Sequence, residues 1–157
     1  GDDARFGEPE LKFGAGIVVM LLPWLVGAKR AKDILLTGID DLSAADALAM
    51  GMVSRVVPAD AVLATAQAIA RRIARVDPVL IQATKGAINA TFETMGLERG
   101  LAQALAVDIA HEARGSPDKA AVLAIAREKG LKAALAWRDG RFAEASDGEP
   151  RRAGGGS

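Results

Sequence analysis

Two carboxylates near the start of the chain, Glu8 and Glu10, are the residues best placed to carry out chemistry. They flank Pro9 in the segment Ala4–Phe13, whose apolar residues alternate loosely, as in a strand end or edge. In an extended chain both side chains would share one face, roughly 6–7 Å apart. Such a pair could divide the roles of general acid and general base. A solvated pair beside a turn is the alternative, and the spacing alone favours it.

A loop with two glycines, Gly14 and Gly16, follows these carboxylates. Glycine accepts backbone angles that let N–H groups approach a ligand closely. The loop matches neither of the glycine-rich phosphate-binding patterns, GxGxxG and GxxxxGKS/T. From these residues alone, an ordinary turn is therefore the simpler interpretation.

The other residues that could take part in chemistry occur singly and form no cluster in the sequence. His111 is the only histidine and the chain has no cysteine, which excludes disulfides, a cysteine nucleophile and a multi-histidine metal site. No metal is therefore predicted, and His111 is interpreted as a structural residue of a helix. Trp24 and Trp137 are interpreted as packing residues rather than stacking platforms. The basic residues of segment 29–32 could meet a phosphate, although a solvated helix face is the default.

Composition limits the partners of the chain. Its 157 residues suffice for one domain with a real core, and twenty acidic residues balance twenty basic ones. This balance gives no reason to expect nucleic acid or an anionic membrane as a partner. The apolar run over residues 17–26 is shorter than the roughly 20 residues that span a bilayer. The lack of cysteine suits a cytoplasmic protein.

The elements that must position the carboxylates are mostly helical. Stripes of apolar residues and stop signals predict helices through Leu36, over Ala44–Met50, over Val62–Val76, and in segments that restart at Pro78, Leu101, Pro117 and Leu131. Ser43 and Asp46 form a capping-box pattern, and Gly51 marks a C-terminal stop. The β-branched run Met52–Val57 predicts a strand. The polar, glycine-rich segment 144–157 predicts a disordered tail.

The order of these segments resembles the enoyl-CoA hydratase/isomerase, or crotonase, family. FGEPE at Phe6–Glu10 is similar to the family motif FGxPE. Later segments resemble further family patterns in the right order: Leu22–Gly38 (LxRxVGxxxAxxLLLTG), 42–58 (SAxEAxxxGLVxxVVP), Thr84–Asn89 (TKxAxN) and Glu128–Phe142 (EGxxAFxxKRxxxF). The resemblance covers roughly residues 4–142.

The resemblance implies an α/β fold, the ClpP-like crotonase spiral of ββα units. Here it would be the C-terminal half, and therefore mostly helical. Residues 1–143 would form the C-terminal part of the domain, with a helical trimerisation region over about 78–143. Trimers or dimers of trimers would follow, which makes a homotrimer or homohexamer the expected assembly.

The family acts on acyl-CoA thioesters, so acyl-CoA is the implied substrate and no further cofactor is expected. Two backbone N–H groups hold the thioester oxygen, and two glutamates manage water and the α-proton. Glu10 corresponds to the second glutamate and would be the general acid/base, with Glu8 as a bystander. Gly14 and Gly16 would shape the site. Trp137 and Arg138, in the last helix, would bear on the CoA.

Three departures from the family pattern change these expectations. The resemblance begins midway, so the oxyanion-hole donors and the other glutamate would come from a missing N-terminal half, and this chain alone should be inactive. The loop after FGxPE is short, and Trp137 replaces a lysine that often contacts CoA. Segment 112–127 is also longer than is usual in the family. A non-catalytic scaffold or assembly module with the same fold is the alternative function.

Overall fold

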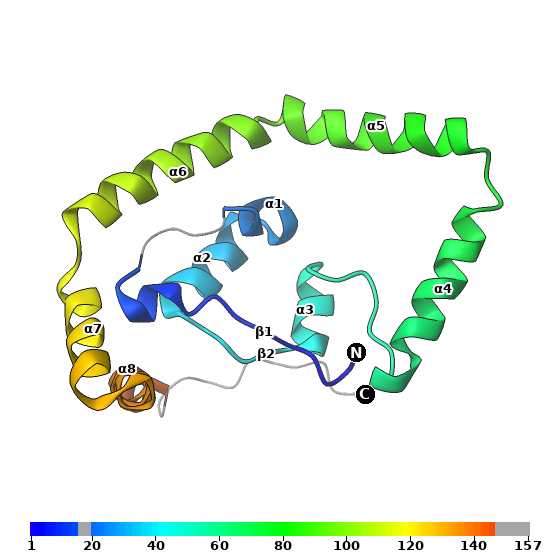
Figure 1. The fold of residues 1–157 in the computed structure, drawn as a ribbon. Coiled ribbons are helices and arrows are strands. Elements are labelled where there is room, and N and C mark those ends of the chain that lie inside the picture. The colour runs from blue at the N-terminus through cyan, green and yellow to red at the C-terminus, as the bar shows by residue number, and fades with distance from the viewer. Residues whose placement is uncertain (16–19, 147–157) are drawn as a thin grey trace.

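Helices dominate the computed structural model, which describes residues 1–15 and 20–146 (Figure 1). The N-terminal part contains a single two-stranded sheet, a 3-10 helix and three short α-helices. The elements are β1 (Arg5–Phe6), η1 (Glu10–Phe13), α1 (Leu22–Val26), α2 (Ala28–Thr37), β2 (Leu42–Ser43) and α3 (Ala44–Met50). After the 3-10 helix η2 (Ala59–Ala61), five α-helices follow: α4 (Val62–Ile73), α5 (Pro78–Thr94), α6 (Leu97–Arg114), α7 (Pro117–Lys129) and α8 (Leu131–Ser146).

A small apolar core lies beside the sheet. β1 and β2 pair antiparallel, with Phe6 opposite Leu42. The buried cluster is built from α1, α2 and β2, and its members are Leu22, Val26, Ala31, Ile34 and Leu42. Phe6, on the strand that leads to the carboxylates, packs against this cluster. The core therefore fixes the start of the segment that carries Glu8 and Glu10.

The caps of α3 form as the sequence predicts. The backbone N–H of Asp46 donates to Ser43 Oγ at 3.1 Å, and the backbone N–H of Ser43 donates to Asp46 Oδ2 at 3.2 Å. Gly51 follows the helix with a φ of +79°, in the left-handed region that glycine adopts at little cost. Local capping therefore defines both ends of Ala44–Met50.

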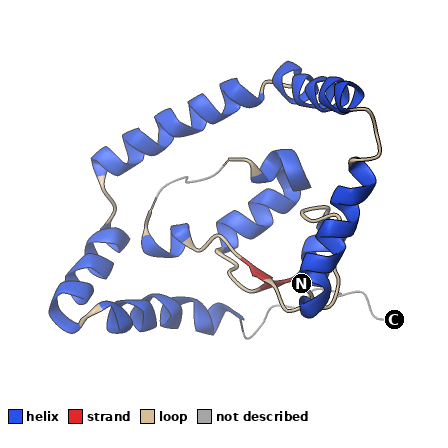
Figure 2. Ribbon diagram, turned by 45° about the vertical axis from the view of Figure 1, so that its right-hand side comes forward, coloured by secondary structure: helices blue, strands red, loops and turns tan. Residues whose placement is uncertain are grey.

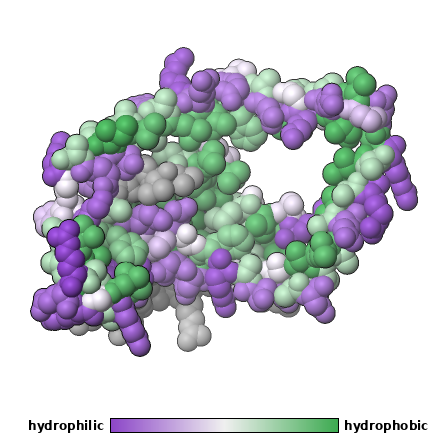
Figure 3. Space-filling model, viewed as in Figure 1, coloured by the Kyte–Doolittle hydropathy of each residue, from purple (hydrophilic) through white to green (hydrophobic). Residues whose placement is uncertain are grey.

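Helices α4, α5 and α6 form an arc around the central elements (Figures 1 and 2). None of their residues is buried. In the view of Figure 3 an opening passes through the molecule beside α4 and α5, with hydrophobic side chains along much of its edge. Helix α6 lies against α1, where a Cβ on Gly100 would be 3.3 Å from Trp24, whereas α4 and α5 bury no residue.

The last two helices pack on each other and against η1. Val122 of α7 is 7% exposed and Ala134 of α8 is fully buried. Ser116, the N-cap of α7, donates a hydrogen bond from Oγ to the carbonyl oxygen of Gly14 at 2.7 Å. Segments about 100 residues apart in sequence therefore meet at the end of η1.

One local prediction was wrong. The run Met52–Val57 is a bend followed by irregular chain rather than a strand. A strand needs a hydrogen-bonding partner, and within residues 1–15 and 20–146 the only strand pairing is that of β1 with β2. The predicted disordered tail, 144–157, stays a prediction; helix α8 reaches Ser146. The remainder of that tail, 147–157, lies outside the described residues, as do residues 16–19.

In the part of the chain that the structure describes, no helix combines the length and apolar character needed to cross a bilayer.

Replacing Gly14 with alanine should lower stability more than the same change at Gly51. Both glycines have positive φ, +65° and +79°, so alanine costs about 1–2 kcal/mol at either position. A Cβ on Gly14 would also lie 2.3 Å from Ser116 Oγ and 2.6 Å from the backbone nitrogen of Lys119, whereas one on Gly51 would meet nothing within 4 Å. Urea unfolding should therefore show an additional loss of about 1–3 kcal/mol for Gly14→Ala. Equal losses for the two variants would contradict the close contact between η1 and α7.

Candidate functional site

Glu10 is the first residue of η1, and residues 7–9 connect it to β1. Pro9 has φ −83° and ψ 7°, so the chain turns into a 3-10 helix instead of continuing as a strand. One carboxylate oxygen, Glu10 Oε2, is buried and has no hydrogen-bond partner within the described residues. A buried carboxylate oxygen without a partner is costly for a protein to maintain, which makes it a candidate for function.

Glu8 lies close to Glu10 and interacts with it. Its backbone N–H donates to the carbonyl oxygen of Ile39 at 3.2 Å, which ties it to the end of α2. Burial raises the pKa of the Glu8 carboxyl, and a side-chain hydrogen bond with Glu10 and the negative charge of Glu10 raise it further. The two carboxyls therefore form a coupled pair. The spacing of the two residues suggested such a pair, whereas the family resemblance made Glu8 a bystander; the two meet across the bend at Pro9 and not along an extended strand.

Of the two loop glycines, Gly14 lies within the described residues. Gly14 ends η1 with a φ of +65°, and its N–H donates to the carbonyl oxygens of Glu10 and Leu11. Its own carbonyl accepts from Ser116 Oγ, and His111 Nε2 lies 3.5 Å away. Gly14 therefore shapes the segment that carries Glu10, and His111 lies beside that segment. The predicted role of Gly16 falls outside the described residues.

The two predicted substrate-binding residues of the last helix have different surroundings. The guanidinium of Arg138 lies 4.3 Å from the centre of the Phe13 ring, next to the end of η1. Its Nε donates to Asp139 Oδ1 at 2.6 Å. The ring of Trp137 instead receives the guanidinium of Arg141, at 4.9 Å. The structure therefore brings Arg138 into contact with the Glu10 segment, whereas the cation on the Trp137 ring comes from α8 itself.

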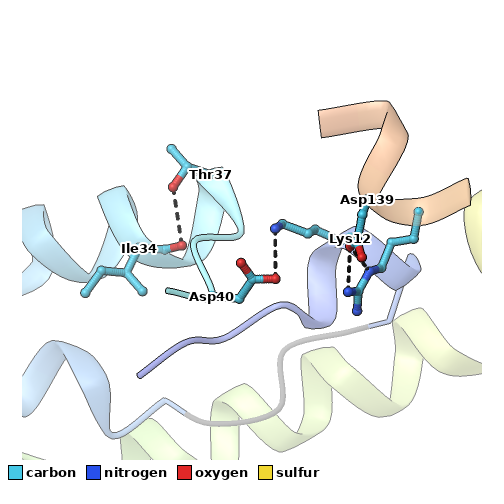
Figure 4. A network of polar contacts seen from close by, with 6 residues as sticks. Lys12, Ile34, Thr37, Asp40 and Asp139 are labelled. Atoms are coloured by element: carbon cyan, nitrogen blue, oxygen red, sulfur yellow. Dashed lines mark hydrogen bonds and ion pairs between the residues drawn. The ribbon is translucent and has the colours of Figure 1, made fainter. Parts of the chain in front are cut away.

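An ion pair that the sequence interpretation missed also holds η1. Lys12 Nζ contacts Asp40 Oδ2 at 3.0 Å, as Figure 4 shows, and the Lys12 side chain is only 11% exposed. Asp40 lies in the loop between α2 and β2. The spacing of 28 residues between these two charges gives no periodic signal, so only the tertiary fold reveals the pair.

A shallow apolar groove of about 320 Å³ runs between α1 and α6. It is lined by Met20, Pro23 and Trp24 on one side and by Gly100, Gln103, Ala104 and Val107 on the other. Asp108 follows Val107 on α6, and its Oδ1 is buried without a hydrogen-bond partner among the described residues. In the same described ranges, no group of three or more histidine or acidic residues is arranged to hold a metal ion.

This arrangement supplies a partly desolvated carboxylate, Glu10, with a second carboxyl, Glu8, in hydrogen-bonding contact. Burial favours the neutral form of Glu8, which can then donate a hydrogen bond to Glu10. A carboxylate in such surroundings can accept a proton from a carbon acid or return one to it. The chemistry available here is therefore proton transfer by a general acid/base.

Stability should fall as the pH rises through the titration of Glu8. A carboxyl whose pKa is raised in the folded state binds its proton more tightly there than when unfolded, so its contribution is complete below the ordinary value of 4.5 and is lost above it. Glu8→Gln should remove this pH dependence and stabilise the protein at pH 7. Urea unfolding between pH 4 and pH 8 measures the effect. The two proteins should be equally stable below pH 4.5, and a difference that stays constant with pH would contradict the coupling.

Comparisons with known proteins show which proteins this chain resembles. The family model described as enoyl-CoA hydratase/isomerase matches residues 1–119. A probable enoyl-CoA hydratase of Mycobacterium bovis is 38% identical over 109 residues, which are 64% of this chain and 39% of that protein. The 2,3-dehydroadipyl-CoA hydratase of Escherichia coli is 37% identical over 107 residues, 66% of this chain and 41% of the relative.

Solved structures show the same similarity. An enoyl-CoA hydratase/isomerase from Xanthobacter autotrophicus Py2 is 56% identical, with a TM-score of 0.86, over 90% of this chain and 52% of that one. An enoyl-CoA hydratase from Mycobacterium smegmatis gives a TM-score of 0.79 at 26% identity. The chain spans about two fifths of the two curated relatives and about half of these solved structures. The predicted crotonase fold, present as a mostly helical half, is confirmed. The chain belongs to the enoyl-CoA hydratase/isomerase family.

Proposed function

We propose that this chain supplies the general acid/base of an active site that hydrates an enoyl-CoA or shifts the double bond of an acyl-CoA. The observation that carries the proposal is the buried, unpartnered Oε2 of Glu10, which lies within the FGEPE motif at the end of β1. In hydration, the carboxyl of Glu10 would deliver a proton to the α-carbon while the oxygen of water adds at the β-carbon, and the other glutamate of the site would take the proton that the water loses. In isomerisation, the same carboxylate would move a proton between two carbons. No cofactor besides the acyl-CoA substrate is required.

The site needs groups that the described residues do not supply. An enolate-like oxyanion forms when a proton leaves the α-carbon of a thioester, and backbone N–H donors must stabilise it. We infer that a polypeptide equivalent to the uncovered part of the relatives provides these donors and the other glutamate, which acts beside Glu10. This chain alone should therefore be inactive.

The exposed apolar face of the arc supports the same inference. Val79 and Leu80 of α5 are 74% and 59% exposed, and Leu63 of α4 is 69% exposed. Helix α5 carries only two charged residues, Lys85 and Glu93, so its apolar character extends around most of its circumference. A helix of this kind is normally buried on several sides. The complementing half would cover one side, and other subunits of a homotrimer or homohexamer would cover another.

The proposal also covers the metabolic role, the compartment and the assembly of the protein. Hydration or isomerisation of acyl-CoA fits a role in fatty acid metabolism. The cysteine-free sequence suits a cytoplasmic compartment. Residues 78–143, which include the arc helices α5 and α6 and most of the α7–α8 pair, would form the trimerisation region of a domain over residues 1–143.

Replacing Glu10 should abolish hydration once the site is complete. The experiment joins this chain to the segment of the Xanthobacter relative that it does not cover and measures hydration of a short enoyl-CoA. Glu10→Gln keeps the size of the side chain but cannot exchange a proton, so kcat should fall by about 100-fold or more. The control is Glu93→Gln, on exposed α5, which should retain activity. Full activity of the Glu10→Gln protein would refute the assigned role.

A non-catalytic scaffold with the crotonase fold is the second candidate. Two observations favour it: Trp137 stands where the family pattern has a lysine, and the guanidinium of Arg138 is stacked on Phe13. If the chain belongs to an enzyme, CoA or acyl-CoA should raise the melting temperature of the completed protein, because a ligand that binds only the folded state stabilises it. A melting temperature that stays unchanged at millimolar CoA would favour the scaffold.

A further inference from the structure

We propose that the last helix positions the catalytic carboxylate, with Arg138 acting through Phe13 to hold η1 in the place that presents Glu10. Arg138 is then a positioning residue and not a contact for the CoA. This inference rests on the proposed function for its catalytic meaning. The positioning itself can be measured without turnover.

The short helix η1 needs such support. It has four residues, Glu10–Phe13, and none of them is buried. Its N-cap makes no side-chain hydrogen bond. A single turn of 3-10 helix has poor hydrogen-bond geometry and little stability of its own. The position of Glu10 must therefore depend on contacts that η1 makes with the rest of the chain.

Arg138 makes the closest of these contacts from α8. Its guanidinium lies 4.3 Å from the centre of the Phe13 ring, within the distance of an effective cation–π contact. The Arg138 side chain is 12% exposed, so water screens the contact only weakly. Asp139 binds both Nε and one terminal nitrogen of the guanidinium, each at 2.6 Å, and this orients its plane. The cation is thus fixed on the ring and is not free to follow a ligand.

A second cation–π contact joins the same two elements, with the cation on η1 and the ring on α8. Lys12 of η1 lies 5.5 Å from the ring centre of Phe142, one helical turn after Arg138. Residues four positions apart share one face of a helix, so Arg138 and Phe142 form a single surface on α8. The ion pair of Lys12 with Asp40, 3.0 Å long, connects this surface to the loop after α2. We name Lys12, Phe13, Arg138 and Phe142 the η1–α8 clamp.

Helix α7 holds the end of η1. Ser116 Oγ donates to the carbonyl oxygen of Gly14 and also accepts the backbone N–H of Lys119, at 3.1 Å, as the N-cap of α7. These contacts and the clamp all fall on Lys12, Phe13 and Gly14. Glu10 is the first residue of η1, at the opposite end of the helix from these contacts. The C-terminal helices therefore hold the segment by the end that lies away from Glu10.

The coupling between Glu8 and Glu10 reports on this position. If η1 loosens, the two carboxyls separate and become more solvated, and the proton affinity of Glu8 must fall. The charged groups facing η1 are Asp40 after α2, His111 of α6, Asp118 and Lys119 of α7, and Arg138 with Asp139 of α8, in addition to its own Lys12. Loss of the Arg138 charge by itself would raise the proton affinity of a nearby carboxyl. Loosening and direct charge loss thus predict shifts of opposite sign.

The test is an NMR titration of the Glu8 side-chain carboxyl in the whole chain and its variants. Arg138→Gln and Phe13→Leu should each lower the Glu8 pKa by about 0.5 unit or more, a roughly threefold weaker proton affinity. Arg138→Lys should restore part of the shift, because lysine keeps the cation but not the planar stack. The control is Lys132→Gln on the same helix, which removes the charge of an exposed residue outside the clamp. It should leave the Glu8 titration unchanged.

Three results would overturn the proposal: an unchanged Glu8 titration in a folded Arg138→Gln or Phe13→Leu chain, a shift to higher pKa in Arg138→Gln, or an equal shift in Lys132→Gln. Far-UV circular dichroism establishes that each variant is folded. If Arg138→Gln loses its helical signal, Phe13→Leu and Arg138→Lys decide the question. Because the titration needs no substrate, a failure here is distinct from a failure of the proposed function, which the hydration assay tests.

Discussion

Burial of apolar surface is the constraint on which the rest of this structure depends, and within the described residues it is concentrated in two places. One is the cluster around Ile34, which is 1% exposed, and the other lies between α7 and α8, where Ala134 is fully buried. The arc from α4 to α6 joins these two places but buries no residue of its own. Each exposed leucine or valine on the arc forgoes about 1.5–3 kcal/mol that full burial would contribute. The arc is therefore the part of the fold that most needs a covering partner.

The candidate site lies where the two buried regions meet. β1 packs on the first cluster through Phe6, and η1 rests on the α7–α8 pair through Phe13 and Gly14. The Lys12–Asp40 ion pair links the two regions across η1. Glu10 begins η1, so both regions determine where its carboxylate lies. This arrangement explains how elements far apart in sequence could serve one proton-transfer group, which is the role that we propose for the chain.

The sequence predicted those features that local residues determine. The capping box of Ser43, the stop at Gly51 and the restart at Pro117 depend on neighbours within one turn, and each appears in the structure. The strand over Met52–Val57 was wrong because pairing depends on a distant segment. The family motif pointed to Glu10 as the candidate general acid/base, and that role stays a prediction. It gave no sign of Glu8 as its partner, because that contact follows from the bend at Pro9, nor of the η1–α8 clamp, which forms across more than 100 residues.

The arc α4–α6, as we propose, packs against a complementing half of the domain. Hydrogen–deuterium exchange of the α5 backbone amides measures this most directly, in the chain alone and joined to the uncovered segment of the Xanthobacter relative. Helical amides without tertiary cover exchange rapidly, whereas those in a packed core are protected up to the global stability. The α5 amides should exchange rapidly in the chain alone and be strongly protected in the completed domain. Equal protection of α5 in both proteins would contradict the packing of the arc against a complementing half.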